Sequence, residues 1–541
     1  MYKLKQIIEK RFKLSAGIVF ILLIAFAWIN RFIQDDAFIS FRYAKNLVKG
    51  WGLVFNKGER VEGYTNFLWT LIISIPVKIG WNPIIFSYII GILFFVITLY
   101  FTYKLSNLIF DSRLLSLLTV FLLGTNYTMS CYATGGMETQ MQTAIVVISY
   151  FLCLKCFTRK TLKNSGWMLL SILLAISILT RPDSVLFVLV ILSALIFIHK
   201  GGELTTKTQL SNYLFLIIPF LLITGVYLIW KLDYYGSILP NTYYAKAAGQ
   251  TSIISGLKYT GWFLTTYWLF PFLLILLIFL KEFFSGMDIK INILLFTILL
   301  WTFYVIKVGG DFMEFRFFVP ILPFIFIILV RIINKLIQSA KLKLVFILLI
   351  FFGSFVHIFT FTYHSGIESV KTLASHLTRP EENWIGVGKK LKRLFDNEDI
   401  KIAVTASGAI PYYSNLPALD MLGLNDPHIS REPHAISERP GHQKLVSISY
   451  LNTQNINLLI GEPLIIENSF NINEISNKMM EEHFMYGIKE LENLHPKILV
   501  VPMDENHNLI MLYLKENASV QNAIDEMKIK MIPYSEIAGN G

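Results

Sequence analysis

Hydrophobic residues occur in long blocks over the first two thirds of the chain, and these blocks then stop. Apolar runs of roughly 15 to 22 residues recur between Leu14 and Tyr363, whereas none follows His364. A helix needs about 20 apolar residues to cross the hydrocarbon core of a bilayer. The pattern predicts an N-terminal tail (1–13), a membrane region (14–362) and a soluble domain (363–541) large enough to bury its own core.

About eleven blocks have the length of a membrane-spanning helix. They cover residues 14–33, 84–103, 114–130, 141–157, 166–180, 184–199, 213–230, 259–280, 291–306, 318–333 and 344–360. The segment 67–79 is shorter and contains Pro76. If it crossed, the loop with Arg159 and Lys160 would lie outside and the loop 131–140, which has no Lys or Arg, inside, against the positive-inside rule.

We therefore expect the segment 67–79 to lie on, or dip into, the outer face as part of a first outer loop, residues 34–83. The remaining crossings are odd in number, so the N-terminus is cytoplasmic and the soluble domain extracytoplasmic. The segment Ala25-Phe26-Ala27 resembles a signal-peptide cleavage site, but it lies inside an apolar run with no polar stretch after it. We expect an uncleaved anchor and a multi-pass protein of the inner (plasma) membrane.

The soluble domain mixes helical and strand patterns. Residues 381–395 have helical periodicity, and residues 401–406, 457–460, 498–501 and 510–514 have the composition of short strands. Because helices and strands alternate, we expect a small α/β domain built in layers.

Composition and charge agree with a membrane protein. The 541 residues are 54% hydrophobic and 16% charged, whereas about a quarter of the residues of soluble domains are charged. The net charge of +11 lies largely in short loops, where Lys and Arg set topology and meet lipid headgroups, so nucleic acid is not an expected partner. The 3 cysteines all lie in the membrane region, which leaves no disulfide framework or cysteine-based metal site.

The first outer loop begins with two adjacent carboxylates, Asp35 and Asp36. Arg42, Lys45 and Lys49 would share one stripe of a helix at the headgroups. The aspartates could simply cap that helix and favour its dipole. A carboxylate beside a low-dielectric region can instead have a raised pKa and act as a base. Neighbouring helical residues diverge by about 100°, so only one of the two should face a substrate.

Four further outer loops carry polar groups. Their candidate residues are Glu138; Arg181 and Asp183; Asn241, Tyr244 and Lys246; and Asp311, Glu314 and Arg316. Arginine suits a phosphate well. Each loop also has a simpler interpretation: a turn before a helix, a self-satisfied Arg/Asp pair, an interfacial aromatic belt, or local ion pairing.

The soluble domain offers weaker signals. Residues 407–414, 419–426 and 440–444 form loops that contain Gly, which could hold a ligand or simply turn the chain. His428, His434 and His442 do not have metal-ligand spacing. The sequence contains no P-loop, dinucleotide fingerprint or serine-hydrolase elbow, so nothing indicates a soluble nucleotide as a donor.

Several motifs together resemble a known superfamily. They are DDAFISFRYA at 35–44, VEGYTNFLW at 61–69, RPD at 181–183, LPNT at 239–242, GDFMEFR at 310–316 and DMLGLND at 420–426. This set is similar to the GT-C superfamily of polyprenyl-phosphate-sugar glycosyltransferases, and in particular to the terminal arabinofuranosyltransferase and LphB-like group. The first-loop motif is the most specific, and the resemblance covers nearly the whole chain.

The resemblance implies a GT-C-like fold and a sugar transfer on the extracytoplasmic face. The donor would be a polyprenyl-phosphate-linked sugar and the acceptor a cell-envelope glycan or glycolipid. Asp35 or Asp36 would be the general base, and Arg181 or Arg316 would hold the departing phosphate. The other implied donor- or acceptor-binding residues are Arg42, Glu62, Tyr64, Asn66, Glu138, Asp183, Asn241, Tyr244, Lys246, Asp311, Glu314 and His442. No metal or other cofactor is expected, because the leaving group is already a phosphate ester.

Two other classes of function stay open at this point. A transporter or flippase of lipid-linked substrates would carry polar groups at the midplane and often an inverted repeat, whereas here the charge lies at the outer mouths and no repeat is visible. A non-catalytic scaffold that binds envelope glycan would leave the first-loop carboxylates unexplained.

Overall fold

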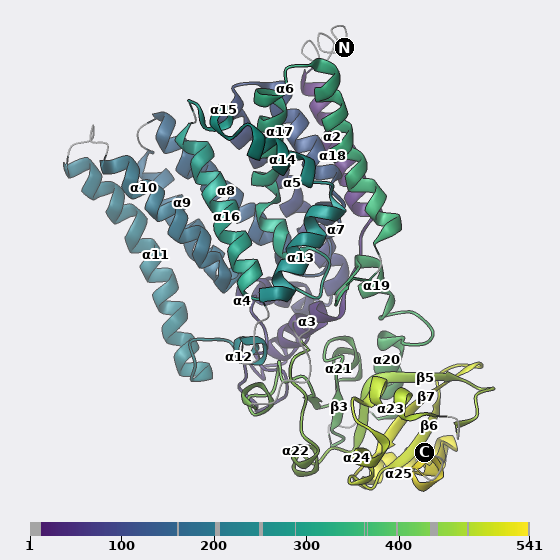
Figure 1. Ribbon diagram of the computed structural model, residues 1–541. Helices are drawn as coiled ribbons and strands as arrows, with labels where there is room; N and C mark the ends of the chain where they lie inside the picture. The colour runs from purple at the N-terminus through teal and green to yellow at the C-terminus, as the bar shows by residue number, and fades with distance from the viewer. Residues whose placement is uncertain are drawn as a thin grey trace.

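A helical region and a sheet-containing region follow one another along the chain (Figure 1). The computed structural model describes residues 12–159, 162–200, 206–247, 253–286, 288–361, 363–364, 366–395, 399–432, 442–472 and 475–538. Most of the predicted N-terminal tail (1–11), His434 and the first two residues of the segment 440–444 lie outside these ranges.

Seven helices in the described ranges are long and apolar enough to cross a membrane. They are α2 (Phe12–Ile29), α5 (Pro83–Phe110), α8 (Thr139–Arg159), α11 (Thr206–Tyr235), α16 (Ile289–Lys307), η2 continued by α17 (Arg316–Ile321 and Leu322–Leu336), and α18 (Ala340–Thr360). Many of their large apolar side chains face outward; on α11, for example, Leu222 and Ile229 are exposed. Such surfaces suit a lipid environment, because the backbone of each helix is satisfied internally and its side chains are apolar.

Two predicted spans are interrupted. Helices α13 (Ile253–Thr266) and α14 (Phe270–Ile278) form an apolar pair bent by 93°. Trp268 at the bend has a φ of +54°, and a Pro lies in the first turn of α14, so a straight helix cannot continue through residues 259–280. The block 114–130 is also divided, because Asn126 ends α6 (Arg113–Thr125) and caps α7 (Tyr127–Cys131).

Shorter helices complete the helical region. The apolar ones are α4 (Phe67–Lys78), α6, α9 (Asn164–Thr180), and η1 continued by α10 (Pro182–Ser184 and Val185–Lys200). The others are α3 (Asp35–Val48), α12 (Asn241–Ala247) and α15 (Leu280–Phe284). Each of the eleven predicted spans coincides with one or more helices, so the chain is a multi-pass membrane protein. The number of crossings stays a prediction.

The two ends of the chain lie at opposite ends of the helical bundle. Figure 1 shows the N-terminal end of α2 at the top and the sheet domain at the bottom, with α3 and α12 between the bundle and that domain. A chain that crosses a membrane an odd number of times, as predicted here, has its two ends on opposite sides. The boundary predicted at residue 363 falls just after α18 and stays a prediction.

A six-stranded mixed sheet forms the core of the C-terminal region. Its strand order is β4-β3-β5-β7-β6-β8, and β3 pairs in parallel with β4 and β5 whereas the other neighbours are antiparallel. The strands are β3 (Ile402–Val404), β4 (Ala418–Asp420), β5 (Leu458–Glu467), β6 (Lys497–Pro502), β7 (His507–Tyr513) and β8 (Lys530–Pro533). All four predicted strands are present, and β4 and β8 are additional.

Short elements surround this sheet. A two-stranded hairpin, β1 (Tyr363–His364) and β2 (Ile367–Glu368), precedes it. The helices are α19 (Val370–Ser375), α20 (Trp384–Leu394), α21 (Ala409–Ser414), η3 (Ile429–Arg431), α22 (Ile448–Thr453), α23 (Asn477–Phe484), α24 (Ile488–Glu492), α25 (Ala518–Met527) and α26 (Ser535–Ala538). Helix α20 is the predicted helix 381–395, and the predicted α/β composition is present.

Helix α3 fastens the C-terminal domain to the helical region. The buried guanidinium of Arg42 donates hydrogen bonds to the backbone oxygens of Phe55, Pro411 and Leu416, the last at 2.8 Å. On the same helix the hydroxyl of Tyr43 lies 3.1 Å from Asn425 Oδ1. The bonds to Pro411, Leu416 and Asn425 join the first outer loop to the C-terminal domain, so the domain is held close to the ends of the helices.

Candidate active site

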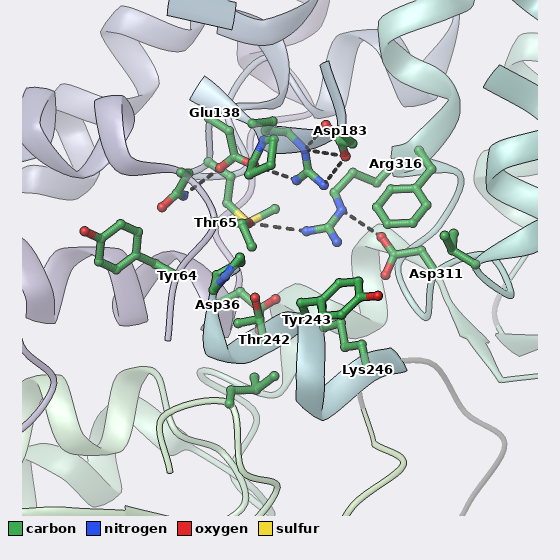
Figure 2. A pocket seen from close by; sticks show the side chains of 18 of the residues that line it. Asp36, Tyr64, Thr65, Glu138, Asp183, Thr242, Tyr243, Lys246, Asp311 and Arg316 are labelled. Atoms are coloured by element: carbon green, nitrogen blue, oxygen red, sulfur yellow. Dashed lines mark hydrogen bonds and ion pairs between the residues drawn. The ribbon is translucent and has the colours of Figure 1, made fainter. Parts of the chain in front are cut away.

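A cavity of about 320 Å³ lies where the outer loops meet the C-terminal domain. All five outer loops that carry candidate residues contribute to its wall, and the C-terminal domain adds Leu424 and Gln443. The polar or aromatic lining side chains are Asp36, Ser40, Tyr64, Thr65, Asn66, Glu138, Arg181, Asp183, Thr242, Tyr243, Lys246, Tyr304, Asp311, Arg316, Phe317 and Gln443. Figure 2 shows most of these side chains pointing into one space.

Asp36 lies in the first turn of α3 and lines this cavity. In the part of the chain that the structure describes, its carboxylate forms no hydrogen bond or ion pair. Burial raises its pKa above the usual value for an aspartate, while the positive charges of Lys246 and Arg316 oppose that rise. A half-buried carboxylate that forms no hydrogen bond or ion pair within the protein is available to a ligand.

Asp35, one residue earlier, points away from the cavity to the C-terminal domain. Its Oδ2 accepts a hydrogen bond from the Gly408 N–H (2.9 Å) and its Oδ1 from the Ala409 N–H (2.7 Å). Gly408 is required there, since a Cβ at that position would lie 2.0 Å from the backbone oxygen of Asp35. Burial raises the pKa of Asp35 to about 7. The two adjacent carboxylates thus have different environments, as the angle between helical neighbours predicts.

Arg316 and Lys246 lie on the side of the cavity that faces Asp36 (Figure 2). Arg316 Nε donates to Asp311 Oδ2 at 2.7 Å, and Nη1 lies 3.6 Å from Met137 Sδ. No described residue accepts a hydrogen bond from Nη2, and none forms an ion pair with Lys246. Burial lowers the pKa of Lys246, although Asp311 and Asp36 act in the opposite direction. Both cations can therefore meet an anion inside the cavity.

Arg181 is instead occupied by carboxylates of the chain itself. Its Nη1 donates to Glu138 Oε1 at 2.8 Å, and its Nη2 donates to Asp183 Oδ2 at 2.7 Å. Asn66 Nδ2 donates to the other Glu138 oxygen at 2.7 Å, and Gln142 Nε2 donates to Asp183 Oδ1 at 2.9 Å. The Arg/Asp pair considered from the sequence is present, and with Glu138 the group carries one net negative charge.

Three predicted site residues lie outside the cavity lining and connect segments. Arg42 is saturated by the interdomain bonds described above. Glu62 is buried and forms an ion pair with Lys231 of α11 at 2.8 Å; burial raises its pKa to about 7. Asn241 Nδ2 donates to the backbone oxygens of Gly423, Leu424 and Asp426 at 2.9–3.1 Å.

Three others lie close to the cavity without lining it. The Tyr244 ring is covered by the Arg431 guanidinium, 4.3 Å from the ring centroid. Glu314 accepts from the Val370 N–H at 2.8 Å and lies 2.7 Å from His357 Nε2. His442 packs edge-on against Phe312, 5.0 Å between ring centroids. The remaining predicted residues, Tyr64, Asn66, Glu138, Arg181, Asp183, Lys246, Asp311 and Arg316, line the cavity with Asp36.

Seven polar or aromatic lining residues were not among the site residues predicted from the sequence. They are Ser40, Thr65, Thr242, Tyr243, Tyr304, Phe317 and Gln443. Helical spacing could have found two of them, because Thr242 and Tyr243 precede Lys246 by four and three residues and so share its face of α12. No spacing in the sequence relates Gln443 to the other lining residues, because its position at the cavity depends on how the C-terminal domain folds. Among the described residues, no three His, Cys, Asp or Glu side chains cluster closely enough to hold a metal ion.

Two curated relatives share part of the sequence. The terminal beta-(1->2)-arabinofuranosyltransferase of Mycobacterium tuberculosis is 25% identical over 247 residues, which cover 43% of this chain and 38% of that enzyme. The enzyme of the same name from Corynebacterium glutamicum is 25% identical over 338 residues, which cover 53% of this chain and 46% of the enzyme. The chain therefore spans less than half the length of either relative. A family described as a domain of unknown function (DUF8728) matches residues 375–494.

Solved structures match nearly the whole chain. ArnT from Cupriavidus metallidurans, bound to undecaprenyl phosphate, has a TM-score of 0.56 at 9% identity, over 92% of this chain and 98% of ArnT. The oligosaccharyltransferase of Archaeoglobus fulgidus has a TM-score of 0.50 at 10% identity, over 91% of this chain and 72% of that protein. The chain thus has the fold of these two transferases, which confirms the predicted GT-C-like helical membrane region with a C-terminal α/β domain.

Proposed function

We propose that this protein is a membrane glycosyltransferase that moves a sugar from a polyprenyl-phosphate donor to a hydroxyl group of a cell-envelope glycan or glycolipid. Its fold is that of ArnT, which was solved with undecaprenyl phosphate. Its curated relatives are arabinofuranosyltransferases, so an arabinofuranosyl donor is the first to test. The reaction takes place on the side of the membrane that holds the C-terminal domain, which we propose to be extracytoplasmic.

One observation carries this proposal. Asp36 is a half-buried carboxylate with no partner in the described ranges, and it shares a cavity with two cationic side chains, Arg316 and Lys246. A base and a phosphate-binding pair on facing walls are the groups that transfer from a sugar phosphate requires. We assign the base to Asp36 rather than Asp35, because both carboxylate oxygens of Asp35 already accept backbone hydrogen bonds.

The proposed reaction is a displacement at the anomeric carbon. The acceptor oxygen forms a bond to that carbon as the bond from carbon to the phosphate oxygen breaks. The proton of the acceptor hydroxyl moves to Asp36, whose raised pKa makes it a stronger base than an exposed aspartate. The electron pair of the broken bond leaves with the polyprenyl phosphate, and Arg316 and Lys246 stabilise the added negative charge.

The other two classes of function account for less of the cavity. A flippase needs a polar path along the spans, whereas every charged residue that lines the cavity comes from an outer loop or from the outer end of a helix. A glycan-binding scaffold needs no unpartnered half-buried carboxylate facing two cations.

The decisive experiment is a transfer assay on purified protein with polyprenyl-phosphoryl arabinofuranose and a synthetic arabinan oligosaccharide. Asp36→Asn should lower the rate by about 10²-fold to 10⁴-fold, because an amide cannot take the proton. Binding of undecaprenyl phosphate should persist in this variant, since Asp36 carries no phosphate-binding role. A near-normal rate in Asp36→Asn would remove it as the base.

Asp35→Asn is the matched comparison. Asn can still accept one of the two backbone hydrogen bonds, so this variant should lower the melting temperature and keep a larger share of the activity. If Asp35→Asn abolished transfer in a fully folded protein while Asp36→Asn did not, the two roles would be reversed.

A further inference from the structure

Two buried polar side chains of the cavity have no partner within the described part of the chain. Thr242 is 7% exposed and Gln443 is 5% exposed, and both line the cavity. Neither Thr242 Oγ1 nor Gln443 Oε1 has a hydrogen-bond partner. Buried polar groups are almost always satisfied, so each exception in a native fold calls for a reason.

Both side chains lie where the C-terminal domain closes the cavity. Gln443 belongs to that domain, and Thr242 follows Asn241, whose amide binds the backbone of residues 423–426. Leu424 of that segment also lines the cavity. The face thus combines two polar side chains with an apolar one, in contrast to the charged faces that Asp36, Arg316 and Arg181 provide.

We propose that Thr242 and Gln443 bind the hydroxyl groups of an uncharged sugar ring held against the C-terminal domain. A threonine hydroxyl and a carboxamide each donate and accept, as sugar hydroxyls do, and Leu424 offers an apolar surface to ring C–H groups. Neither Thr242 nor Gln443 carries a charge, so these two side chains supply no counter-ion for an acidic sugar. The inference deepens the proposed function and rests on it for the reaction, but the binding of the sugar is testable separately.

Stability gives the first test. The variants are Thr242→Val and Gln443→Met, which keep the approximate shape and remove the polar atoms. Without ligand, each should melt at the same temperature as the wild type or higher, because an unsatisfied polar group is lost from the interior. Thr119→Val is the control: Thr119 is also buried, but its hydroxyl donates to the Leu115 carbonyl at 2.8 Å. A fall in melting temperature in both cavity variants, beyond that of the control, would mean a structural role and overturn the proposal.

Ligand recognition gives the second test. In the transfer assay, the two cavity variants should raise KM for the oligosaccharide acceptor or for the arabinofuranosyl donor by roughly 5-fold to 100-fold. A higher KM for the oligosaccharide would mean that Thr242 and Gln443 bind a ring of the acceptor. A higher KM for the donor would mean that they bind the arabinofuranosyl ring. Binding of undecaprenyl phosphate, which has no sugar, should stay within about twofold of the wild type, as in Thr119→Val. Unchanged KM for both substrates would overturn the proposal.

A direct binding measurement separates this inference from the proposed function. Wild-type protein and the Thr242→Val/Gln443→Met double variant are compared on a panel of immobilised neutral and acidic glycans. Wild type should bind at least one neutral glycan more strongly than the double variant does, even if no sugar transfer is detected. If the wild type and the double variant bound every glycan equally, or if the double variant lost only the acidic glycans, the proposal of a sugar-binding face would be wrong. Absence of transfer by the wild type would count against the proposed function alone.

Discussion

At the scale of single residues, neighbours in the sequence have different roles. The sequence predicted that only one of Asp35 and Asp36 faces a substrate, but it could not say which, because the answer depends on the position of residues 408 and 409. Likewise Arg181 and Arg316 were equivalent candidates from the sequence. Arg181 has two carboxylate partners and Arg316 has one, a difference that pattern and spacing do not encode.

This difference predicts that Arg316→Lys mainly weakens binding and that Arg181→Lys mainly lowers stability. Arg316→Lys removes the planar fork, so one ammonium would have to serve both Asp311 and a phosphate. We expect binding of undecaprenyl phosphate to weaken by about 10-fold. Arg181→Lys cannot bridge Glu138 and Asp183 in the same way, so its main effect should be a lower melting temperature with lipid phosphate binding nearly preserved.

Calorimetry with undecaprenyl phosphate in detergent, paired with thermal melts, measures both quantities. If Arg181→Lys lost lipid phosphate binding and Arg316→Lys did not, the phosphate would have to lie beside Arg181, and the assignment of Arg316 would be wrong.

At the scale of elements, the hydrophobic pattern predicted where helices lie better than where they break. Residues 259–280 contain no charged residue, yet the chain turns by 93° within them, because a single Trp in a left-handed conformation leads into a Pro. The length of an apolar run does not show whether the helix within it bends. Strands β4 and β8 were not predicted. They have 3 and 4 residues, and unlike the equally short β3 they do not lie in a run that was assigned a strand composition.

The predicted topology is testable at α4. Helix α4 has 12 residues with a Pro inside, shorter than the length of about 20 that a span needs. If α4 does not cross, reporter fusions after Gly202 and after Gly541 should fall on opposite sides, with Gly541 outside. Fusions after Gly58 and after Gly80, which flank α4, should lie on the same side. Fusions after Gly202 and Gly541 on the same side would contradict the model of topology, and fusions after Gly58 and Gly80 on opposite sides would mean that α4 crosses.

At the scale of the whole molecule, the site exists because two distant parts of the chain meet. The sequence identified all five outer loops and the 420–426 motif, but not how they fit together. The joints are Arg42 to residues 411 and 416, Asp35 to residues 408 and 409, and Asn241 to residues 423–426. Arg42 and Asn241 were predicted to bind substrate. In the sequence, a polar residue that joins two domains looks the same as one that binds a ligand, so the two roles could not be told apart.

Three carboxyl groups whose pKa is raised by burial also predict how stability depends on pH. Burial raises the pKa of Asp35 and Glu62 to about 7 and that of Asp420 to about 6, whereas unfolded carboxyl groups titrate near pH 4. Between about pH 4 and pH 7 the folded state therefore binds more protons than the unfolded state, and the free energy of unfolding falls as pH rises through this window. His376, whose pKa two glutamates raise to about 10 against the effect of burial, contributes stability that is lost as pH rises further.

Thermal melts of the purified protein from pH 5 to pH 8, at fixed ionic strength, measure this dependence. The melting temperature should decline across the range, and Asp35→Asn and Asp420→Asn should each reduce the slope, because a neutral amide has no proton to lose. Asp525→Asn is the matched control, since Asp525 lies on the exposed face of α25, and its slope should equal that of the wild type. A melting temperature that rises between pH 5 and pH 7, or equal slopes in all four proteins, would mean that Asp35 and Asp420 are ionised throughout this range and do not make the stability of the fold depend on pH.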